Sequence, residues 1–155
     1  MEIYARIKKD HDEARELMEK IKKTSPGDER DELFEYFARD MWLHHKLEEA
    51  VFYRTLAEKR KTRGEAFEAE NEHHVANGLL EELETMPADS HEWMAKFGVL
   101  CELIEHHMDE EEEETFEEAR EVLSGEIAEE MGQRFDERKE VLMAALEPLD
   151  YSSEI

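Results

Sequence analysis

The chain has 155 residues, of which 41% are charged and 39% hydrophobic, and its formal net charge is −24. This length suits one domain with a sizeable core. The negative charge argues against nucleic acid and anionic membranes as partners, because both are bound through Lys and Arg. With only six Gly and three Pro residues, the composition favours an all-α fold.

Cysteine content and hydropathy indicate the compartment. Cys101 is the only cysteine, which excludes an intrachain disulfide and the CxxC type of zinc or redox motif. The N-terminal segment lacks the apolar core of a signal peptide, and no stretch approaches the roughly 18 apolar residues of a membrane span. We therefore expect a soluble, cytoplasmic protein without a membrane partner.

Apolar residues recur at spacings of three and four along the chain, which is the pattern of one helix face. The predicted helices span residues 3–23, 29–60, 65–85, 91–122 and 126–146. Pro26, Pro87 and Gly125 lie in the breaks between them. Asp89, with Glu92 three residues later, has the spacing of a capping box at the fourth helix.

The connections between the first four helices are short, at about four to six residues. Short connections favour antiparallel neighbours. The sequence therefore predicts an antiparallel up-down-up-down four-helix bundle with an additional C-terminal helix, and we assign residues 1–155 to one domain.

Histidine and glutamate occupy the apolar faces of these helices. His11 lies on the first helix and His73 on the third. The second and fourth helices carry His-xxx-Glu pairs, His44 with Glu48 and His107 with Glu111. Residues four apart stack along one helix face, so each pair can offer a nitrogen and a carboxylate to the same small volume.

Three histidine doublets require a choice between their members: His44-His45, His73-His74 and His106-His107. Helical phase favours His44, His73 and His107 as the inward members, because the other histidine of each doublet points about 100° away. We expect the other members beside or behind the site. The pair His106 and Glu110 is the most credible alternative.

Metal binding would explain carboxylates in a bundle core. An uncompensated buried carboxylate costs several kcal/mol, whereas two cations could be bridged by two carboxylates and capped by four imidazoles. Such mixed ligands suit iron or manganese better than calcium or magnesium. The competing interpretation is a bundle used for protein contacts, with hydrogen-bonded core histidines, surface His-Glu pairs and no metal.

The histidine-bearing segments resemble the hemerythrin-like, HHE cation-binding family. The resemblance rests on Lys9–Glu13, His44–Tyr53, Glu72–Leu83 and Leu103–Glu112. It implies a four-helix bundle with two non-haem iron ions in an oxo- or hydroxo-bridged centre. It also implies that Glu48 and Glu111 bridge the ions, that His11 and His44 serve one, and that His73 and His107 serve the other. Manganese or zinc would accept the same ligands.

The chain departs from the oxygen-carrying members of this family at two positions. Those proteins have a histidine four residues after the third-helix histidine, where this chain has Asn77, and a carboxylate five residues after the fourth-helix histidine, whereas Glu111 follows His107 by four. Glu70, water or substrate could fill the position left by the missing imidazole. A more open, oxygen-rich site favours reaction with an oxidant over reversible oxygen carriage.

Two functions follow from this resemblance. The first is a di-iron protein that binds or reacts with dioxygen, peroxide or nitric oxide. Tyr36 and Tyr53 on the second helix would be nearby hydrogen-bond donors or redox partners, or else packing residues at the edge of the core. The alternative is an iron storage, delivery or sensing module without turnover. The sequence leaves the small molecule, the metal, the reductant and the oligomeric state open.

Overall fold

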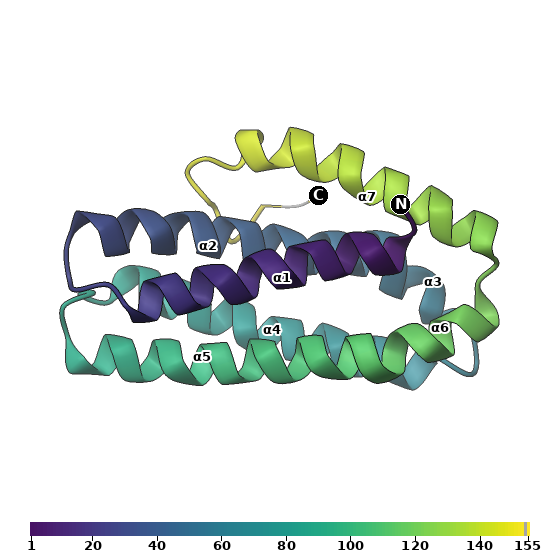
Figure 1. Ribbon diagram of the computed structural model, residues 1–155, viewed down its shortest axis with the longest axis horizontal. Coiled ribbons are helices and arrows are strands. Elements are labelled where there is room, and N and C mark those ends of the chain that lie inside the picture. Colours follow the sequence, from purple (N-terminus) through teal and green to yellow (C-terminus); the bar gives the residue numbers. More distant parts are fainter. Residues whose placement is uncertain (154) are drawn as a thin grey trace.

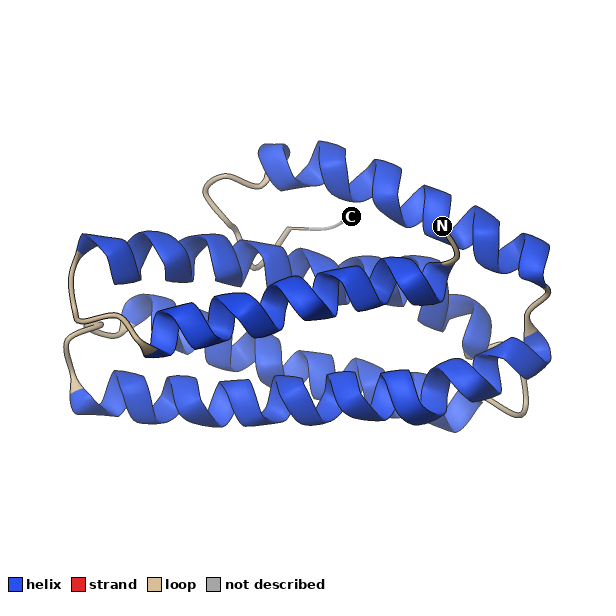
Figure 2. Ribbon diagram, in the orientation of Figure 1, coloured by secondary structure: helices blue, strands red, loops and turns tan. Residues whose placement is uncertain are grey.

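The computed structural model describes residues 1–153 and 155, and all regular structure within them is helical (Figure 2). The elements in chain order are α1 (Ile3–Lys22), α2 (Asp28–Leu47), η1 (Glu48–Tyr53), α3 (Arg54–Leu56), α4 (Arg63–Thr85), α5 (His91–Glu110), η2 (Glu111–Thr115), α6 (Phe116–Val122) and α7 (Gly125–Ala145), where η marks a π-helical segment. The all-α class expected from the sequence is confirmed.

Four helical rods form the bundle (Figure 1). They are α1, α2 with its extensions η1 and α3, α4, and α5 with its extensions η2 and α6. The additional helix α7 lies outside the bundle and packs on α1 and α2. Its approach to the N-terminal segment is so close that a Cβ at Gly132 would overlap the Met1 carbonyl oxygen.

Two rods contain a π-helical segment, and both segments begin at a glutamate on the apolar face. These glutamates are Glu48 at the start of η1 and Glu111 at the start of η2. A π-helical turn holds an extra residue, so it changes the direction of the side chains that follow it. The long second and fourth helices therefore do not keep one regular phase along their length.

The second rod ends at Leu56, earlier than the predicted end near residue 60. The reason lies in the following turn, whose side chains satisfy the last carbonyl groups. Thr62 Oγ1 donates to the Leu56 carbonyl at 2.7 Å, and Arg63 Nε donates to the Ala57 carbonyl at 3.0 Å.

The capping box predicted at Asp89 and Glu92 is wrong by one residue. Ser90 is the N-cap of α5, and its Oγ accepts a hydrogen bond from the Trp93 backbone N–H at 3.1 Å. Ser124 caps α7 in the same way, through the Ile127 N–H. Serine satisfies a free backbone donor at the helix start as well as aspartate does.

A polar layer divides the apolar core into two clusters. One cluster contains Ile3 and Ile7 of α1, and the other contains Ala14 and Met18 of the same helix. His11 lies between these two pairs and is fully buried. The candidate site therefore lies in the middle of the bundle, with apolar packing on both sides.

Some large apolar side chains on the helices lie at the surface and not in the core. These exposed residues are Phe67, Leu103, Ile127 and Val141.

Among the described residues, no helix combines the length and the apolar character that a membrane span requires.

Candidate metal centre

Six side chains predicted from the sequence converge between the apolar clusters. They are His11, His44, Glu48, His73, His107 and Glu111, none of them more than 7% exposed. Their ligand atoms form two groups, each within 4.8 Å: the first has His11, His44, Glu48 and Glu111, and the second has Glu48, His73 and His107. Glu48 belongs to both groups.

The two glutamates each contact histidines of both groups. Glu48 Oε1 lies 2.9 Å from His44 Nε2 and 3.3 Å from His73 Nε2. Glu111 Oε1 lies 3.0 Å from His11 Nε2, and Glu111 Oε2 lies 3.4 Å from His107 Nε2. Both carboxylates therefore span the two halves of the site.

Four further carboxylates hold the outer nitrogens of the histidines. The Nδ1 contacts are His11 with Glu112 (2.8 Å), His44 with Asp10 (2.7 Å), His73 with Glu49 (2.9 Å) and His107 with Glu72 (2.9 Å). Each carboxylate comes from a different rod than its histidine, so the contacts form a closed ring around the bundle. We call these four residues the carboxylate ring.

The carboxylate ring sets the orientation of the imidazoles. An ionised carboxylate only accepts hydrogen bonds, so the Nδ1 atom beside it carries the hydrogen and Nε2 is left to face the site. This is the arrangement by which proteins fix the tautomer and raise the basicity of metal-binding histidines. Burial raises the pKa of Glu49, the partner of His73, to about 7, so this carboxylate ionises at a higher pH than an ordinary glutamate.

Several buried atoms of the site lack a hydrogen-bond partner among the described residues. They are His11 Nε2, His44 Nε2, both carboxylate oxygens of Glu48, and Glu111 Oε1. The neighbouring site atoms are close, but their angles do not suit hydrogen bonds. Each unsatisfied buried polar group costs about 1–3 kcal/mol, or more when it is charged. Cations between these atoms would remove that cost, so the residues present fit a metal centre.

Without metal, two buried carboxylates close together are electrostatically unfavourable. Burial and the Glu111 carboxylate raise the pKa of Glu48 well above its ordinary value. Burial acts in the same direction on Glu111, but the adjacent imidazoles of His107 and His11 hold the pKa of Glu111 well below the ordinary range. One glutamate therefore retains a proton while the other is ionised.

The facing imidazoles of His73 and His107 also have pKa values that are shifted in opposite directions. Their Nε2 atoms lie 3.0 Å apart. Burial holds the pKa of His73 well below its ordinary value, whereas for His107 the nearby Glu111 and Glu72 carboxylates outweigh burial and raise the pKa well above it. A metal-free site therefore holds protons where cations would otherwise lie.

Helix α7 contributes to the site through a buried lysine. Lys139 Nζ lies 2.7 Å from Asp10 Oδ2 and 2.7 Å from Asp40 Oδ1. Arg6 also contacts Asp10, at 2.7 Å. Burial acts to raise the pKa of Asp10, but His44 and these two cations hold it well below its usual range. The carboxylate that orients His44 therefore stays ionised.

His45 has a more central position than its phase on the helix predicts. It is 2% exposed, and its ring stacks on that of His73 with centroids 4.2 Å apart. Its Nδ1 lies 2.8 Å from Asn77 Oδ1. Asn77 thus supports a buried histidine at the position where the oxygen carriers place an imidazole.

Tyr53, at the end of η1, is buried against the site, and its hydroxyl donates a hydrogen bond to Glu111 Oε2. Burial, followed by the Glu111 and Glu48 carboxylates, raises the pKa of Tyr53 well above its ordinary value. The phenol therefore stays protonated. Of the two tyrosines considered from the sequence, Tyr53 is thus a hydrogen-bond donor at the site, whereas Tyr36 is 45% exposed.

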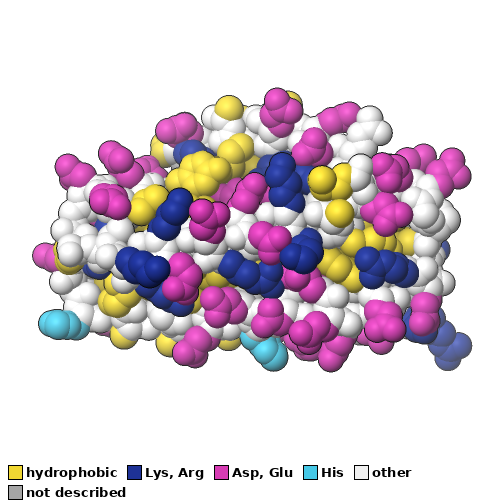
Figure 3. All heavy atoms as spheres, viewed as in Figure 1, with side chains coloured by type: hydrophobic (Ala, Val, Ile, Leu, Met, Phe, Trp, Pro, Cys, Tyr) yellow, Lys and Arg dark blue, Asp and Glu magenta, His cyan; other side chains and the backbone are white. Residues whose placement is uncertain are grey.

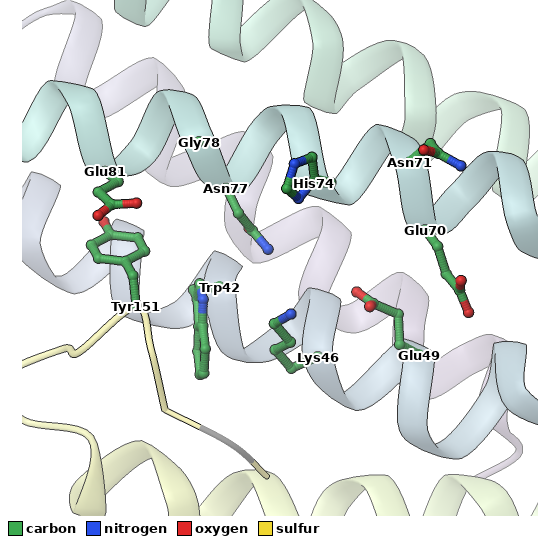
Figure 4. A pocket seen from close by; sticks show the side chains of 10 residues that line it. All are labelled: Trp42, Lys46, Glu49, Glu70, Asn71, His74, Asn77, Gly78, Glu81 and Tyr151. Atoms are coloured by element: carbon green, nitrogen blue, oxygen red, sulfur yellow. The ribbon is translucent and has the colours of Figure 1, made fainter.

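Glu70, proposed from the sequence as an extra ligand, belongs to neither group of ligand atoms. It lines a surface pocket of about 470 Å³ with Lys46, Glu49, His74 and Asn77 (Figure 4). Of the three occupants that the sequence left open for the position of the missing imidazole, Glu70, water and substrate, Glu70 therefore lies outside both groups of ligand atoms.

The pair His106 and Glu110 lies outside the core. The His106 side chain is 73% exposed, and its Nε2 lies 3.5 Å from Glu110 Oε2. Helical phase correctly selected His107 as the inward member of this doublet.

A small cavity of about 20 Å³ leads from the surface toward the site. Tyr53, His107 and Glu111 lie among the residues that line it. A volume of this size holds about one water molecule. The cavity opens on the half of the site that contains His107.

The family model for the hemerythrin HHE cation binding domain matches residues 2–119, which are 118 of the 155 residues. The chain belongs to this family. Membership implies the binding of metal cations, and the buried histidine and glutamate groups fit such a site. Helix α7, which supplies Lys139, lies beyond the matched residues.

A solved structure also resembles this hemerythrin-domain chain. It is the crystal structure of a hemerythrin HHE cation binding domain-containing protein from Mycobacterium kansasii, with a TM-score of 0.81 and 23% sequence identity. The match covers 94% of this chain and 89% of the other, and at this identity it shows the fold. None of the curated proteins compared with the chain matches it.

Neither the carboxylate ring nor Lys139 is among the residues predicted from the sequence. A signal for the ring was present, because each ring residue is adjacent in sequence to a residue of the cluster: Asp10 to His11, Glu49 to Glu48, Glu72 to His73 and Glu112 to Glu111. In a chain with 44 acidic residues, that signal does not stand out.

Proposed function

We propose that this protein holds two iron ions in the bundle core and that it binds or reacts with a small oxidant such as dioxygen, peroxide or nitric oxide. His11 and His44 would bind one ion, and His73 and His107 the other. Glu48 and Glu111 would bridge them. Manganese or zinc could occupy the same ligands.

The observation that carries this proposal is the orientation of the four imidazoles. All four Nε2 atoms face the two glutamates, while all four Nδ1 atoms contact the carboxylate ring. A purely structural histidine cluster has no reason to leave Nε2 atoms and carboxylate oxygens buried without hydrogen bonds. A pair of cations accounts for the inward atoms and the outer ring together.

The size of the access cavity supports a small ligand. A cavity of about 20 Å³, which holds about one water molecule, favours a very small ligand over larger organic substrates. When bound, two iron ions would supply the electrons that reduce such an oxidant. The protonated hydroxyl of Tyr53 would donate a hydrogen bond beside Glu111, where a ligand from the cavity would arrive.

The test is metal analysis of the aerobically purified protein, combined with an absorption spectrum and a peroxide challenge on the same sample. We expect about two irons per chain, a near-ultraviolet charge-transfer band and rapid loss of peroxide. Absence of bound metal after reconstitution with ferrous iron would contradict the proposal.

Turnover separates this function from the storage, delivery or sensing alternative. Iron that is retained against a chelator while peroxide disappears supports reactivity. Iron that leaves on reduction, with no loss of peroxide, supports the alternative.

A further inference from the structure

A polar pocket of about 470 Å³, the one that Glu70 lines, lies between α2 and α4 beside the metal centre (Figure 4). Its volume is in the range of sites that bind small organic molecules. Carboxylates alone do not single out this pocket, because Asp and Glu side chains are spread over the surface (Figure 3). The placement of its hydrogen-bond donors does.

The first of these donors is the indole N–H of Trp42, a side chain that lines the pocket and is only 1% exposed. Trp93, the other tryptophan, donates its indole N–H to the Leu83 carbonyl at 3.0 Å. Trp42 Nε1 has no such acceptor among the described residues, and Figure 4 shows it on the edge of the ring nearest Asn77. A buried indole N–H normally has a partner, so this pocket calls for an acceptor from outside the chain.

Two further donors lie beside Trp42. Asn77 Oδ1 lies 2.8 Å from His45 Nδ1, and the amide nitrogen of Asn77 points into the pocket (Figure 4). Lys46 Nζ lies 5.8 Å from the centre of the Trp42 ring. An indole N–H, an amide and an ammonium group offer together the donors that a carboxylate accepts.

Two acceptors line the same pocket on the far side of Lys46 from Trp42. They are the carboxylates of Glu49 and Glu70, which are neighbours in Figure 4. Glu49 Oε2 contacts His73 Nδ1 at 2.9 Å, which leaves its Oε1 for a ligand. Such a pair of carboxylates suits an ammonium group.

We propose that this pocket binds a small zwitterionic molecule of the size of an amino acid. Its carboxylate accepts hydrogen bonds from Trp42, Asn77 and Lys46, and its ammonium group lies at Glu49 and Glu70. A simple anion would be repelled by the two glutamates, and a simple cation by the lysine, so the pocket selects a molecule that carries both charges. Binding here does not depend on metal.

The pocket is connected to the metal centre through two of its residues. Asn77 contacts His45, whose ring stacks on that of His73 with centroids 4.2 Å apart. Glu49 contacts His73 directly. A ligand that shifts either residue also shifts His73, so the zwitterion and the metal should change each other's affinity by the same factor. This coupling rests on the proposed function.

The test titrates the metal-free full chain with ω-amino acids of increasing length, from glycine to ε-aminocaproate, and with butyrate and butylamine as single-charge comparisons. Binding is followed by the nuclear magnetic resonance signal of the Trp42 indole N–H, which is identified by its loss in Trp42→Phe. We expect a saturable shift with at least one amino acid, with a Kd on the order of 1 mM, and binding of the single-charge compounds about tenfold weaker or less. No saturable shift with any amino acid would overturn the site. Equal binding of butyrate or butylamine would overturn the preference for a zwitterion.

A glycine in the pocket wall provides the variant. Gly78 lines the pocket, and a Cβ at this position would meet no other part of the chain within 4 Å. Gly78→Leu should therefore fill the pocket and keep the fold, because leucine also favours the helix more than glycine does. Gly98→Leu on α5 is the matched control, since Gly98 is equally unobstructed and does not line the pocket. We expect the shift to disappear in Gly78→Leu and to remain in Gly98→Leu, and a shift that persists in Gly78→Leu would overturn the site.

The coupling is measured by the same titration after loading with Zn²⁺, which is diamagnetic. We expect the Kd of the zwitterion to differ by about fivefold or more between the metal-free and the zinc-loaded chain. Equal values would overturn the coupling. A chain that takes up no metal would contradict the proposed function instead, and the metal-free titration would still decide the pocket.

Discussion

Lys139 Nζ lies 2.7 Å from Oδ2 of Asp10, the carboxylate oxygen that also contacts His44 Nδ1 at 2.7 Å. Through this contact the helix outside the bundle reaches a candidate metal ligand. Both residues of the pair are buried, so water does not weaken the interaction. Helix α7 therefore helps to position His44, through Lys139 and Asp10.

Replacement of this lysine tests that role. We expect Lys139→Met to lower the free energy of unfolding by about 3 kcal/mol, because Asp10 and Asp40 lose a buried partner. Denaturant unfolding measures the change. Arg134→Met removes an exposed cation from the same helix and should have little effect. Equal stability of the two variants would contradict the role of Lys139.

The carboxylate ring predicts an effect on metal affinity. Glu112→Ala removes the contact to His11 Nδ1 and should weaken metal binding by about 10–100-fold, because the ring no longer fixes that imidazole. Competition with a chelator of known affinity measures the change. Glu113→Ala alters the exposed neighbour and serves as the control. Equal affinities would show that His11 needs no such support.

The raised pKa of Glu48 predicts a pH-dependent gain in stability on substitution. Above the ordinary pKa of glutamate, the unfolded chain has released this proton while the folded chain retains it. Stability from Glu48 therefore falls as pH rises. In metal-free protein, Glu48→Gln should match the wild type near pH 4.5 and become more stable as pH increases toward 8.

Unfolding by denaturant at several pH values measures this difference. The same substitution should abolish tight metal binding, since the amide cannot bridge two cations as a carboxylate can. A difference that stays constant with pH would show that Glu48 ionises normally in the folded protein.

We expect removal of the Tyr53 hydroxyl to affect both the stability of the metal-free protein and the absorption spectrum of the iron-loaded protein. Tyr53→Phe removes a buried hydrogen bond to Glu111 and should cost about 1.5–3 kcal/mol in metal-free protein. Two metal ions per chain should still bind, with an altered absorption spectrum in the iron-loaded form. Wild-type stability together with a wild-type spectrum would exclude a role for this hydroxyl.

The sequence by itself determined the helices and the inward member of each histidine doublet. Each helical residue turns the side chain by about 100°, so the apolar residues around His44, His73 and His107 reveal which way those histidines point. His45 shows the limit of this rule. Its direction differs from that of His44, yet packing between α2 and α4 buries it against His73.

Only the tertiary structure decided which groups meet across helices. Asp10 holds a histidine 34 residues away, Glu112 holds one 101 residues away, and Lys139 reaches both Asp10 and Asp40 from a separate helix. The π-helical segments at Glu48 and Glu111 also have no signature in the periodicity. Helical phase is a local property of the chain, whereas these contacts depend on the rotation and register with which whole helices pack.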